Sequence, residues 1–173
     1  MRMQLDATVK TLDGKWDFEF VESAPQVNSK FEMEALKTWE TLNDTARVTM
    51  GTGAYTTEIN FTKDEAKAKW AIDLGDVRES ARVFVNGQLI GCAWSVPFVL
   101  NCNDAFKEGK NTIRIEVTNL PANRIAELDR QGVKWRKFDE INVVDINYKK
   151  TSYANWEVVK SGLNSDVKLI KTL

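Results

Sequence analysis

Aromatic side chains beside planar polar ones are the residues of this chain whose chemistry points to ligand binding. The sequence has six tryptophans and three tyrosines among 173 residues. Sugars bind proteins by stacking the apolar faces of their rings on aromatic side chains, while their hydroxyls bond to groups such as Asn, Asp, Arg and Glu. The composition therefore supplies what a carbohydrate-binding surface needs.

The first candidate sugar contact is Trp94, with Ser95 beside it. Both lie in residues 91–97, which we expect to form a loop between two strands. A tryptophan in such a loop suits a stacking platform for a sugar ring. Packing in the core or against a neighbouring domain explains Trp94 equally well.

The second candidate is Trp135, which stands between basic residues at 134 and 136. An arginine beside an aromatic ring, here Arg136, can hold the carboxylate of a uronic acid bidentately. The alternative is a solvated basic edge. Further candidate sugar contacts are Tyr148, Tyr153, Trp156, Arg78, Asn123 and Arg124. For Arg78, Asn123 and Arg124 the alternative is a purely structural role, such as bracing a loop.

Catalytic chemistry has little support in the sequence. The chain has no histidine, which excludes Ser-His-Asp and Cys-His catalysis and an HExxH zinc site. Glycosidases use a pair of carboxylates, but the spacing of the available acids establishes no pair. These acids are Asp129, Asp139, Glu140 and Asp145.

Two cysteines, Cys92 and Cys102, are too few for a four-thiolate metal site. We expect two free, partly buried thiols, with a disulfide as the open alternative. The formal net charge is -1, and no basic patch indicates nucleic acid. No apolar run is long enough to span a membrane, and the first ten residues lack the apolar core of a signal peptide.

Alternation of apolar and polar residues with period two marks a series of half-buried strands. The clearest are residues 15–21, 55–61, 70–74, 81–85, 98–102 and 113–117. Asn86-Gly87 predicts a type I′ hairpin turn, because both residues tolerate positive φ. Strands joined by short polar turns predict an all-β antiparallel β-sandwich, since a parallel sheet needs long helical crossovers.

Other segments carry weaker signals. We expect a short strand at 31–35, an exposed loop at 40–47, a helical turn at 103–106, a turn at 108–111, a helix or polar loop at 123–131, a bulged strand at 141–148, a polar loop at 151–165 and a closing strand at 167–170. No linker or repeat divides the chain, so we expect a single domain over residues 1–173.

The central part of the chain resembles the sugar-binding, jelly-roll domain of glycoside hydrolase family 2. The pattern includes a GTGxY strand entry at 51–55, the sequence VNG at 85–87, an aromatic loop that ends in Pro97-Phe98, and GKNT at 109–112. It is more similar still to the C-terminal accessory domain of bacterial rhamnosidase-like enzymes of glycoside hydrolase family 106. That similarity covers DLGDVRESARVFVNG at 73–87, VTNLPANR at 117–124 and Ser161-Gly162-Leu163.

The resemblance implies a galactose-binding domain-like jelly roll that accompanies a catalytic barrel located elsewhere in the parent protein. Its implied partners are a plant or microbial glycan and that catalytic domain, in the periplasm or outside the cell. Modules of this kind often hold a structural calcium ion on loop oxygens, although the chain has no DxDxDG-type loop. We expect a non-catalytic carbohydrate-binding module. The alternative is a structural domain that packs against the barrel and binds no sugar itself.

Overall fold

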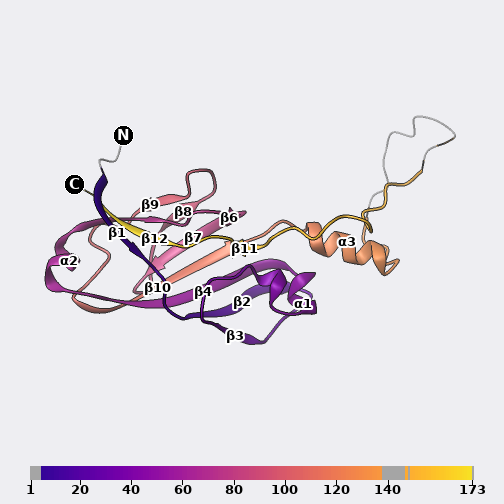
Figure 1. Ribbon diagram of the computed structural model, residues 1–173. Helices are drawn as coiled ribbons and strands as arrows, with labels where there is room; N and C mark the ends of the chain where they lie inside the picture. Colours follow the sequence, from indigo (N-terminus) through magenta and orange to yellow (C-terminus); the bar gives the residue numbers. More distant parts are fainter. Residues whose placement is uncertain (1–4, 138–146, 148, 173) are drawn as a thin grey trace.

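Two antiparallel sheets pack face to face in the computed structural model, which describes residues 5–137, 147 and 149–172 (Figure 1). The larger sheet has the order β3-β2-β4-β10-β7-β8, and the smaller has the order β1-β12-β5-β9. A two-stranded ribbon joins β6 to β11. The all-β antiparallel sandwich expected from the sequence is thus confirmed.

The strands are β1 (Leu5–Thr11), β2 (Trp16–Ala24), β3 (Lys30–Met33), β4 (Met50–Phe61), β5 (Lys69–Asp73), β6 (Val77–Arg78), β7 (Ser80–Val85), β8 (Gln88–Ala93), β9 (Val99–Asn101), β10 (Gly109–Thr118), β11 (Gly162–Leu163) and β12 (Lys168–Thr172). The helical segments are the 3-10 turn η1 (Trp39–Thr41) and the helices α1 (Asp44–Arg47), α2 (Lys63–Lys67) and α3 (Ala122–Arg130).

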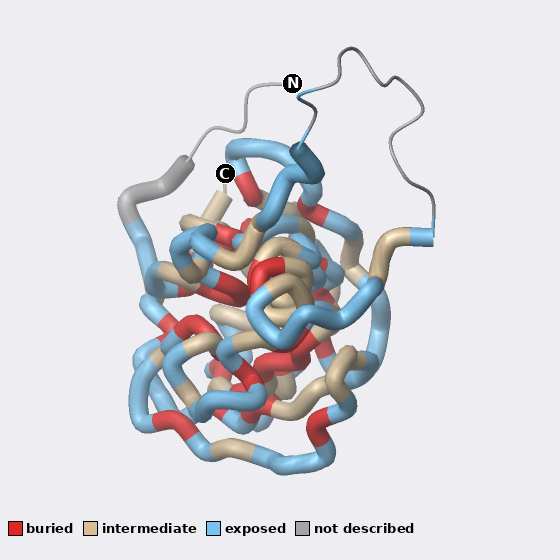
Figure 2. The backbone as a smooth tube through the Cα atoms, turned by 90° about the vertical axis from the view of Figure 1, so that its right-hand side faces the viewer, coloured by how far each residue is buried: buried red, intermediate tan, exposed pale blue. Residues whose placement is uncertain are grey.

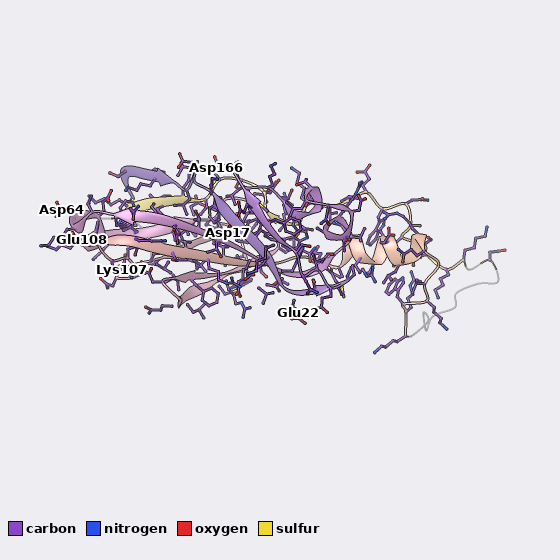
Figure 3. The ribbon with its side chains drawn as sticks, turned by 90° about the horizontal axis from the view of Figure 1, so that it is seen from below. Asp17, Glu22, Asp64, Lys107, Glu108 and Asp166 are labelled. Atoms are coloured by element: carbon purple, nitrogen blue, oxygen red, sulfur yellow. The ribbon has the colours of Figure 1, made fainter. Side chains whose placement is uncertain are left out.

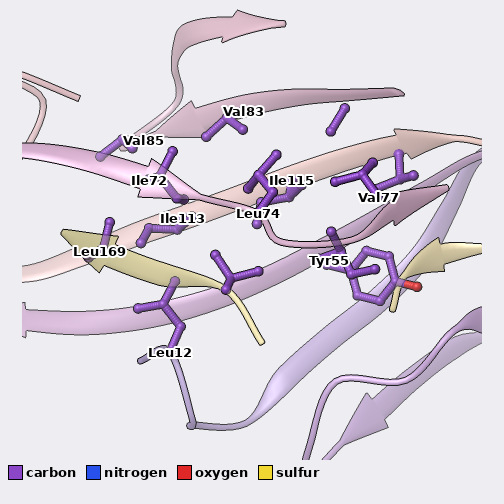
Figure 4. Packing of buried hydrophobic residues seen from close by; sticks show 14 of the residues in the cluster. Leu12, Tyr55, Ile72, Leu74, Val77, Val83, Val85, Ile113, Ile115 and Leu169 are labelled. Atoms are coloured by element: carbon purple, nitrogen blue, oxygen red, sulfur yellow. The ribbon is translucent and has the colours of Figure 1, made fainter. Parts of the chain in front are cut away.

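The core lies between the two sheets and follows the predicted alternation. In β10, Ile113, Ile115 and Val117 are fully buried, and Figure 4 shows Ile113 and Ile115 among side chains from the facing sheet such as Ile72 and Leu169. Buried residues gather inside the molecule and exposed ones cover its outside (Figure 2). Burial of these apolar side chains is the main driving force for this fold.

The hairpin between β7 and β8 turns at Asn86-Gly87, as predicted. Their φ angles are 51° and 81°, which is the left-handed pair that a type I′ turn requires. Asn86 does more than turn the chain. Its amide donates to Asn111 Oδ1 at 2.8 Å and accepts from the Thr112 backbone N–H at 3.1 Å, so it also ties the hairpin to the start of β10.

In the first fifty residues, one strand has no counterpart in the prediction and one expectation is wrong. Residues 5–11 form β1, which pairs with β12; its apolar positions are few and Val9 is half-exposed, so the alternation is weak. Residues 40–47 are not a loop but contain the end of η1 and helix α1. Asn43 begins this helix, because its side chain accepts a hydrogen bond from the Ala46 N–H at 2.8 Å.

Smaller corrections concern turns and the end of the chain. Residues 91–93 belong to β8, so the loop is 94–98, and β10 already begins at Gly109. The segment 123–131 is helical, and the strand expected at 141–148 lies almost wholly outside the described residues. The strand expected at 31–35 and the closing strand are confirmed as β3 and β12.

Both thiols are free, as expected: Cys92 is exposed, whereas Cys102 is buried. Burial raises the pKa of the Cys102 thiol to about 12, so it stays protonated. Across the described residues, we find no helix with the length and apolar character needed to cross a membrane.

A ladder of charged side chains crosses the outer face of the larger sheet. Glu19 accepts from Lys30 at 3.1 Å and from Arg114 at 3.2 Å. Arg114 also contacts Glu116 at 3.1 Å, and Glu116 contacts Arg82 at 2.8 Å. Both cations hold the pKa of the Glu19 carboxyl below its usual range, chiefly by hydrogen bonding from Lys30. Arg114 is the member that joins β2 to β10.

Arg114→Met should therefore lower the free energy of unfolding by about 1–3 kcal/mol, because it leaves the nearly buried Glu116 with one cation instead of two. Lys110→Met is the matched control. Its partner Glu58 is more than half exposed, so the loss should be within about 0.5 kcal/mol. Urea unfolding of both variants measures the difference, and equal losses would show that the ladder does not act as a unit.

Candidate functional site

The most conspicuous feature outside the sandwich is an arm formed by α3 and residues 131–137 and 149–159. Figure 1 shows α3 beyond the ends of the strands, at the opposite end of the molecule from the two termini. Seen from below, α3 is also far from Asp64, Lys107 and Glu108 (Figure 3). The arm therefore extends beyond the ends of the strands.

Hydrogen bonds hold the two passes of the arm together. The buried amide of Asn123 donates to the Val159 carbonyl at 2.8 Å and accepts from its N–H at 2.9 Å. Arg130 donates to the carbonyls of Ala154 at 3.0 Å and Trp156 at 3.3 Å. The first and last turns of α3 thus both hold the backbone of the returning segment, which is residues 149–159.

Helix α3 ends in a way that turns the chain sharply. Gly132 has a φ of 66°, and the Val133 N–H donates to the Leu128 carbonyl at 2.9 Å, while the Gly132 N–H donates to Asp129 at 3.1 Å. These bonds form a Schellman motif. The turn brings the residues that follow back against the last turn of the helix, where Asp129 lies.

Four of the candidate residues meet on this arm, and we call them the arm cluster: Trp135, Arg136, Tyr153 and Trp156. The rings of Tyr153 and Trp156 are 4.4 Å apart, and those of Trp135 and Tyr153 are 6.3 Å apart. The Arg136 guanidinium lies 5.1 Å from the Trp135 ring centre and 5.0 Å from that of Tyr153. Cation–π contacts of this kind order both partners.

Asp129 fastens the arm cluster to α3. Its Oδ1 accepts from Trp135 Nε1 at 2.6 Å, and its Oδ2 accepts from the Tyr153 N–H at 2.7 Å. These two bonds hold the pKa of the Asp129 carboxyl below its usual value, and the bond from the Tyr153 backbone has the largest effect. The charges of Arg136 and Lys150 lower this pKa by a smaller amount. A carboxylate in the last turn of a helix opposes the helix dipole, so its two bonds to the cluster account for its place there.

Two hollows flank the arm. The first, of about 320 Å³, has a lining that includes Asp129, Lys134, Trp135, Arg136 and Lys150. The second lies between α1, α3 and the returning segment, and Trp156, 47% exposed, lines it together with Asp44, Arg47, Glu127, Arg130 and Glu157. An exposed indole beside planar polar groups is an arrangement that can bind a sugar ring and its hydroxyls.

The remaining candidates are not brought to the arm cluster. Trp94 is 77% exposed in the loop between β8 and β9, with Ser95 beside it, and this loop contributes no residue to either hollow. Arg78, on β6, binds Asp76 through both Nε and Nη2 at 2.8 Å, which braces the loop. Arg124 is half-buried in the first turn of α3.

The side-chain amide of Asn123 is fully engaged with the backbone of Val159, so we leave Asn123 outside the candidate site. Tyr148 lies outside the described residues. Among the residues that the structure describes, no three Cys, Asp or Glu side chains gather as metal ligands. The structural calcium ion stays a prediction.

Sequence reasoning missed the residues that assemble the cluster, Asp129 and Arg130. In the sequence, Asp129 is only one of several acids. The pairing of an acid in the last helical turn with a glycine three positions later was a usable signal for a helix end, but nothing local connects Asp129 to Tyr153.

Comparison with known proteins places this arrangement in a family. Residues 37–159 match the family model described as glycosyl hydrolase 2 galactose-binding domain-like. The chain belongs to this family. The matched region of this chain runs from just before η1 to residue 159, and so includes β4 to β10 and the residues of the arm.

Individual relatives are large proteins. The chain is 29% identical, over 177 aligned positions, to a protein named "Putative beta-glucuronidase" from Formosa agariphila, covering 91% of this chain and 15% of that protein. A solved rhamnosidase from Novosphingobium sp. PP1Y is 26% identical with a TM-score of 0.75, covering 99% of this chain and 16% of that one. The chain therefore spans about one sixth of the length of these relatives.

A β-glucuronidase from Bifidobacterium dentium, solved in complex with coumarin-3-O-glucuronide, shares the fold at 20% identity, with a TM-score of 0.65 over 95% of this chain and 30% of that one. The resemblance stated from the sequence is thus confirmed at the level of the family. The chain is a galactose-binding-like domain of the kind found in glycoside hydrolases.

Proposed function

We propose that this chain is a non-catalytic carbohydrate-binding domain of a larger, exported bacterial glycoside hydrolase, and that the arm cluster is its sugar-binding surface. The observation that carries the proposal is the convergence of Trp135, Tyr153 and Trp156 around Arg136, held in place by Asp129. The relatives bearing the names of glycosidases support a parent enzyme of that class. The catalytic domain would lie in the rest of the parent protein, in the periplasm or outside the cell.

The cluster is suited to this function because its geometry exists before any ligand arrives. Asp129 and Arg130 fix both the indole of Trp135 and the backbone that carries Tyr153 and Trp156. Binding to such a surface does not have to offset the entropy of ordering these side chains. A half-exposed indole at its edge leaves one aromatic face for a sugar ring.

Trp156→Ala should weaken glycan binding by about tenfold, because burial of an aromatic face contributes on the order of 1.4 kcal/mol. Trp94→Ala is the matched control: it removes a still more exposed indole from a loop outside both hollows and should leave binding unchanged. A glycan array followed by calorimetric titration makes the measurement. Absence of saturable binding at millimolar sugar would overturn the proposal, and a loss confined to the Trp94 variant would move the site to the β8–β9 loop.

One observation favours a second function, a domain that packs against the catalytic domain and binds no sugar. Large apolar side chains are exposed along the arm and just before it, namely Leu120, Val133, Trp156 and Val159. Exposed large apolar side chains, where they form a contiguous patch, mark protein interfaces. In that case the isolated chain would bind a hydrophobic dye at the arm and show no response on the glycan array.

A further inference from the structure

The two hollows beside the arm differ in the sign of their charge. Among the residues that the structure describes, the first is lined by three cations, Lys134, Arg136 and Lys150, and by the carboxylate of Asp129. The second is lined by two arginines and three acids, listed above. A negatively charged group is therefore attracted to the first hollow and repelled from the second.

The Asp129 carboxylate in the first hollow does not oppose an anion strongly. Both of its oxygens already accept hydrogen bonds, from Trp135 Nε1 at 2.6 Å and from the Tyr153 N–H at 2.7 Å. These donors face the carboxylate and reduce its effect on the rest of the hollow. Lys134 and Lys150 come from the two different passes of the arm, so cations border the hollow from both segments.

Aromatic surface and positive charge occur together here. The Arg136 guanidinium lies against Trp135 and Tyr153 and donates to the Thr151 carbonyl at 2.6 Å. A sugar ring packed on Trp135, the aromatic residue that lines this hollow, would place its exocyclic substituent near Lys134 and Lys150 in the same hollow. A neutral hydroxymethyl group gains little from that position, whereas an anionic substituent gains Coulomb attraction.

We propose that the first hollow binds the anionic substituent of a charged sugar, either the carboxylate of a uronic acid residue or a sulfate ester. The inference rests on the proposed carbohydrate-binding function and adds the class of sugar that the arm selects. Both anions share the same chemistry toward lysine and arginine, and both are commonly bound by these side chains.

Matched pairs of probes test the inference. Methyl β-D-glucuronide and methyl β-D-galacturonide are compared with the corresponding neutral glucoside and galactoside, with methyl glucoside 6-sulfate and inorganic sulfate as further arms. NMR titration of the tryptophan indole signals reports binding. We expect the charged sugars to bind about tenfold more tightly than the neutral ones at low ionic strength, and this preference should shrink in 0.5 M salt to about twofold.

The charge variant is the double substitution Lys134→Gln and Lys150→Gln. It should abolish the preference for charged sugars while leaving neutral binding unchanged. The matched control is Lys63→Gln with Lys107→Gln, which changes the net charge equally and should keep the preference. Lys63 begins α2 next to Asp64, and Figure 3 shows Asp64 and Lys107 at the far end of the sandwich. A control variant that loses the preference to the same extent would show a general charge effect and overturn the local site.

The outcomes separate this inference from the function on which it rests. Equal binding of charged and neutral sugars would overturn anion selection and leave carbohydrate binding intact. Failure of every sugar to bind would overturn both. Inorganic sulfate that binds as tightly as the sulfated sugar would show an anion site with no contribution from a sugar ring, and would also overturn the inference.

Discussion

Gly162→Ala should destabilise the domain by roughly 3–5 kcal/mol, a large effect for a single methyl group. Gly162 has a φ of 103°, a conformation that side chains rarely adopt. A Cβ atom here would also collide with the Tyr55 hydroxyl and approach Trp39 Cε3 to 3.1 Å. Both neighbours are fully buried, so neither can move aside at low cost.

Gly87→Ala is the control for this prediction. Gly87 also has a positive φ, of 81°, but a Cβ atom there would meet nothing within 4 Å. Alanine should cost only about 1 kcal/mol at this position, the intrinsic penalty of the left-handed region. Urea unfolding of the two variants measures the two losses in free energy of unfolding. The difference between them is the cost of the Cβ collision at Gly162 beyond the backbone penalty that both positions share. A loss at Gly162 no greater than at Gly87 would contradict the packing described here.

The size of the expected effect reflects where the arm rejoins the sandwich. Ser161 is buried; its N–H donates to Glu40 at 2.9 Å, and its carbonyl accepts from the Trp39 N–H at 2.9 Å. Asn119 lies where the chain leaves β10 and leads into α3, and it donates to the Ser161 hydroxyl at 3.0 Å. Displacement of Gly162 would therefore disturb both the attachment of the arm and the aromatic core around Tyr55.

Much of the sandwich could be predicted because its signals are local. The alternation in β10 and the turn residues Asn86-Gly87 specify their structure within a few positions. Strand β1 escaped prediction because it lies at an edge, where burial constrains only some residues. Helix α1 escaped because four residues show no periodicity, and the capping signal of Asn43 was the one available sign.

The candidate site was predictable in its parts and not in its assembly. Trp135, Arg136, Tyr153 and Trp156 attract attention by residue type alone. Trp94 attracts the same attention, yet it lies in a different region of the fold. Which tryptophans converge depends on bonds between positions far apart in the sequence, such as the one from Tyr153 to Asp129, which are 24 positions apart. Such bonds leave no pattern that a single sequence reveals.

Asp129→Ala should release the arm cluster without unfolding the sandwich. The substitution removes the acceptors for Trp135 Nε1 and for the Tyr153 N–H, so hydrogen exchange at the Tyr153 amide should accelerate by about tenfold. The free energy of unfolding of the whole domain should change little, because α3 and residues 131–137 and 149–159 contribute no side chain to the core cluster. Glycan affinity should fall at least as far as with Trp156→Ala, since the cluster loses its preformed geometry.

Glu157→Ala is the matched control, because it removes an exposed carboxylate from the returning segment that lines the second hollow. It should leave exchange at Tyr153 unchanged. Asp129→Asn keeps one acceptor oxygen and loses the charge, so its effect should be intermediate. Unaltered exchange at Tyr153 in the alanine variant would contradict the bracing role of Asp129.

The same bonds predict how the arm responds to acid. The pKa of Asp129 is depressed in the folded protein, so its carboxylate stabilises the arm fully above the ordinary aspartate pKa of about 3.9. That stabilisation is lost as the pH falls from this value through the folded pKa, because protonation removes the charge that both donors require. Exchange at Tyr153 in the native protein should therefore approach that of Asp129→Ala only below about pH 4, after correction for the intrinsic pH dependence of exchange. An arm that loosened near neutral pH instead would have to depend on some group other than this carboxylate.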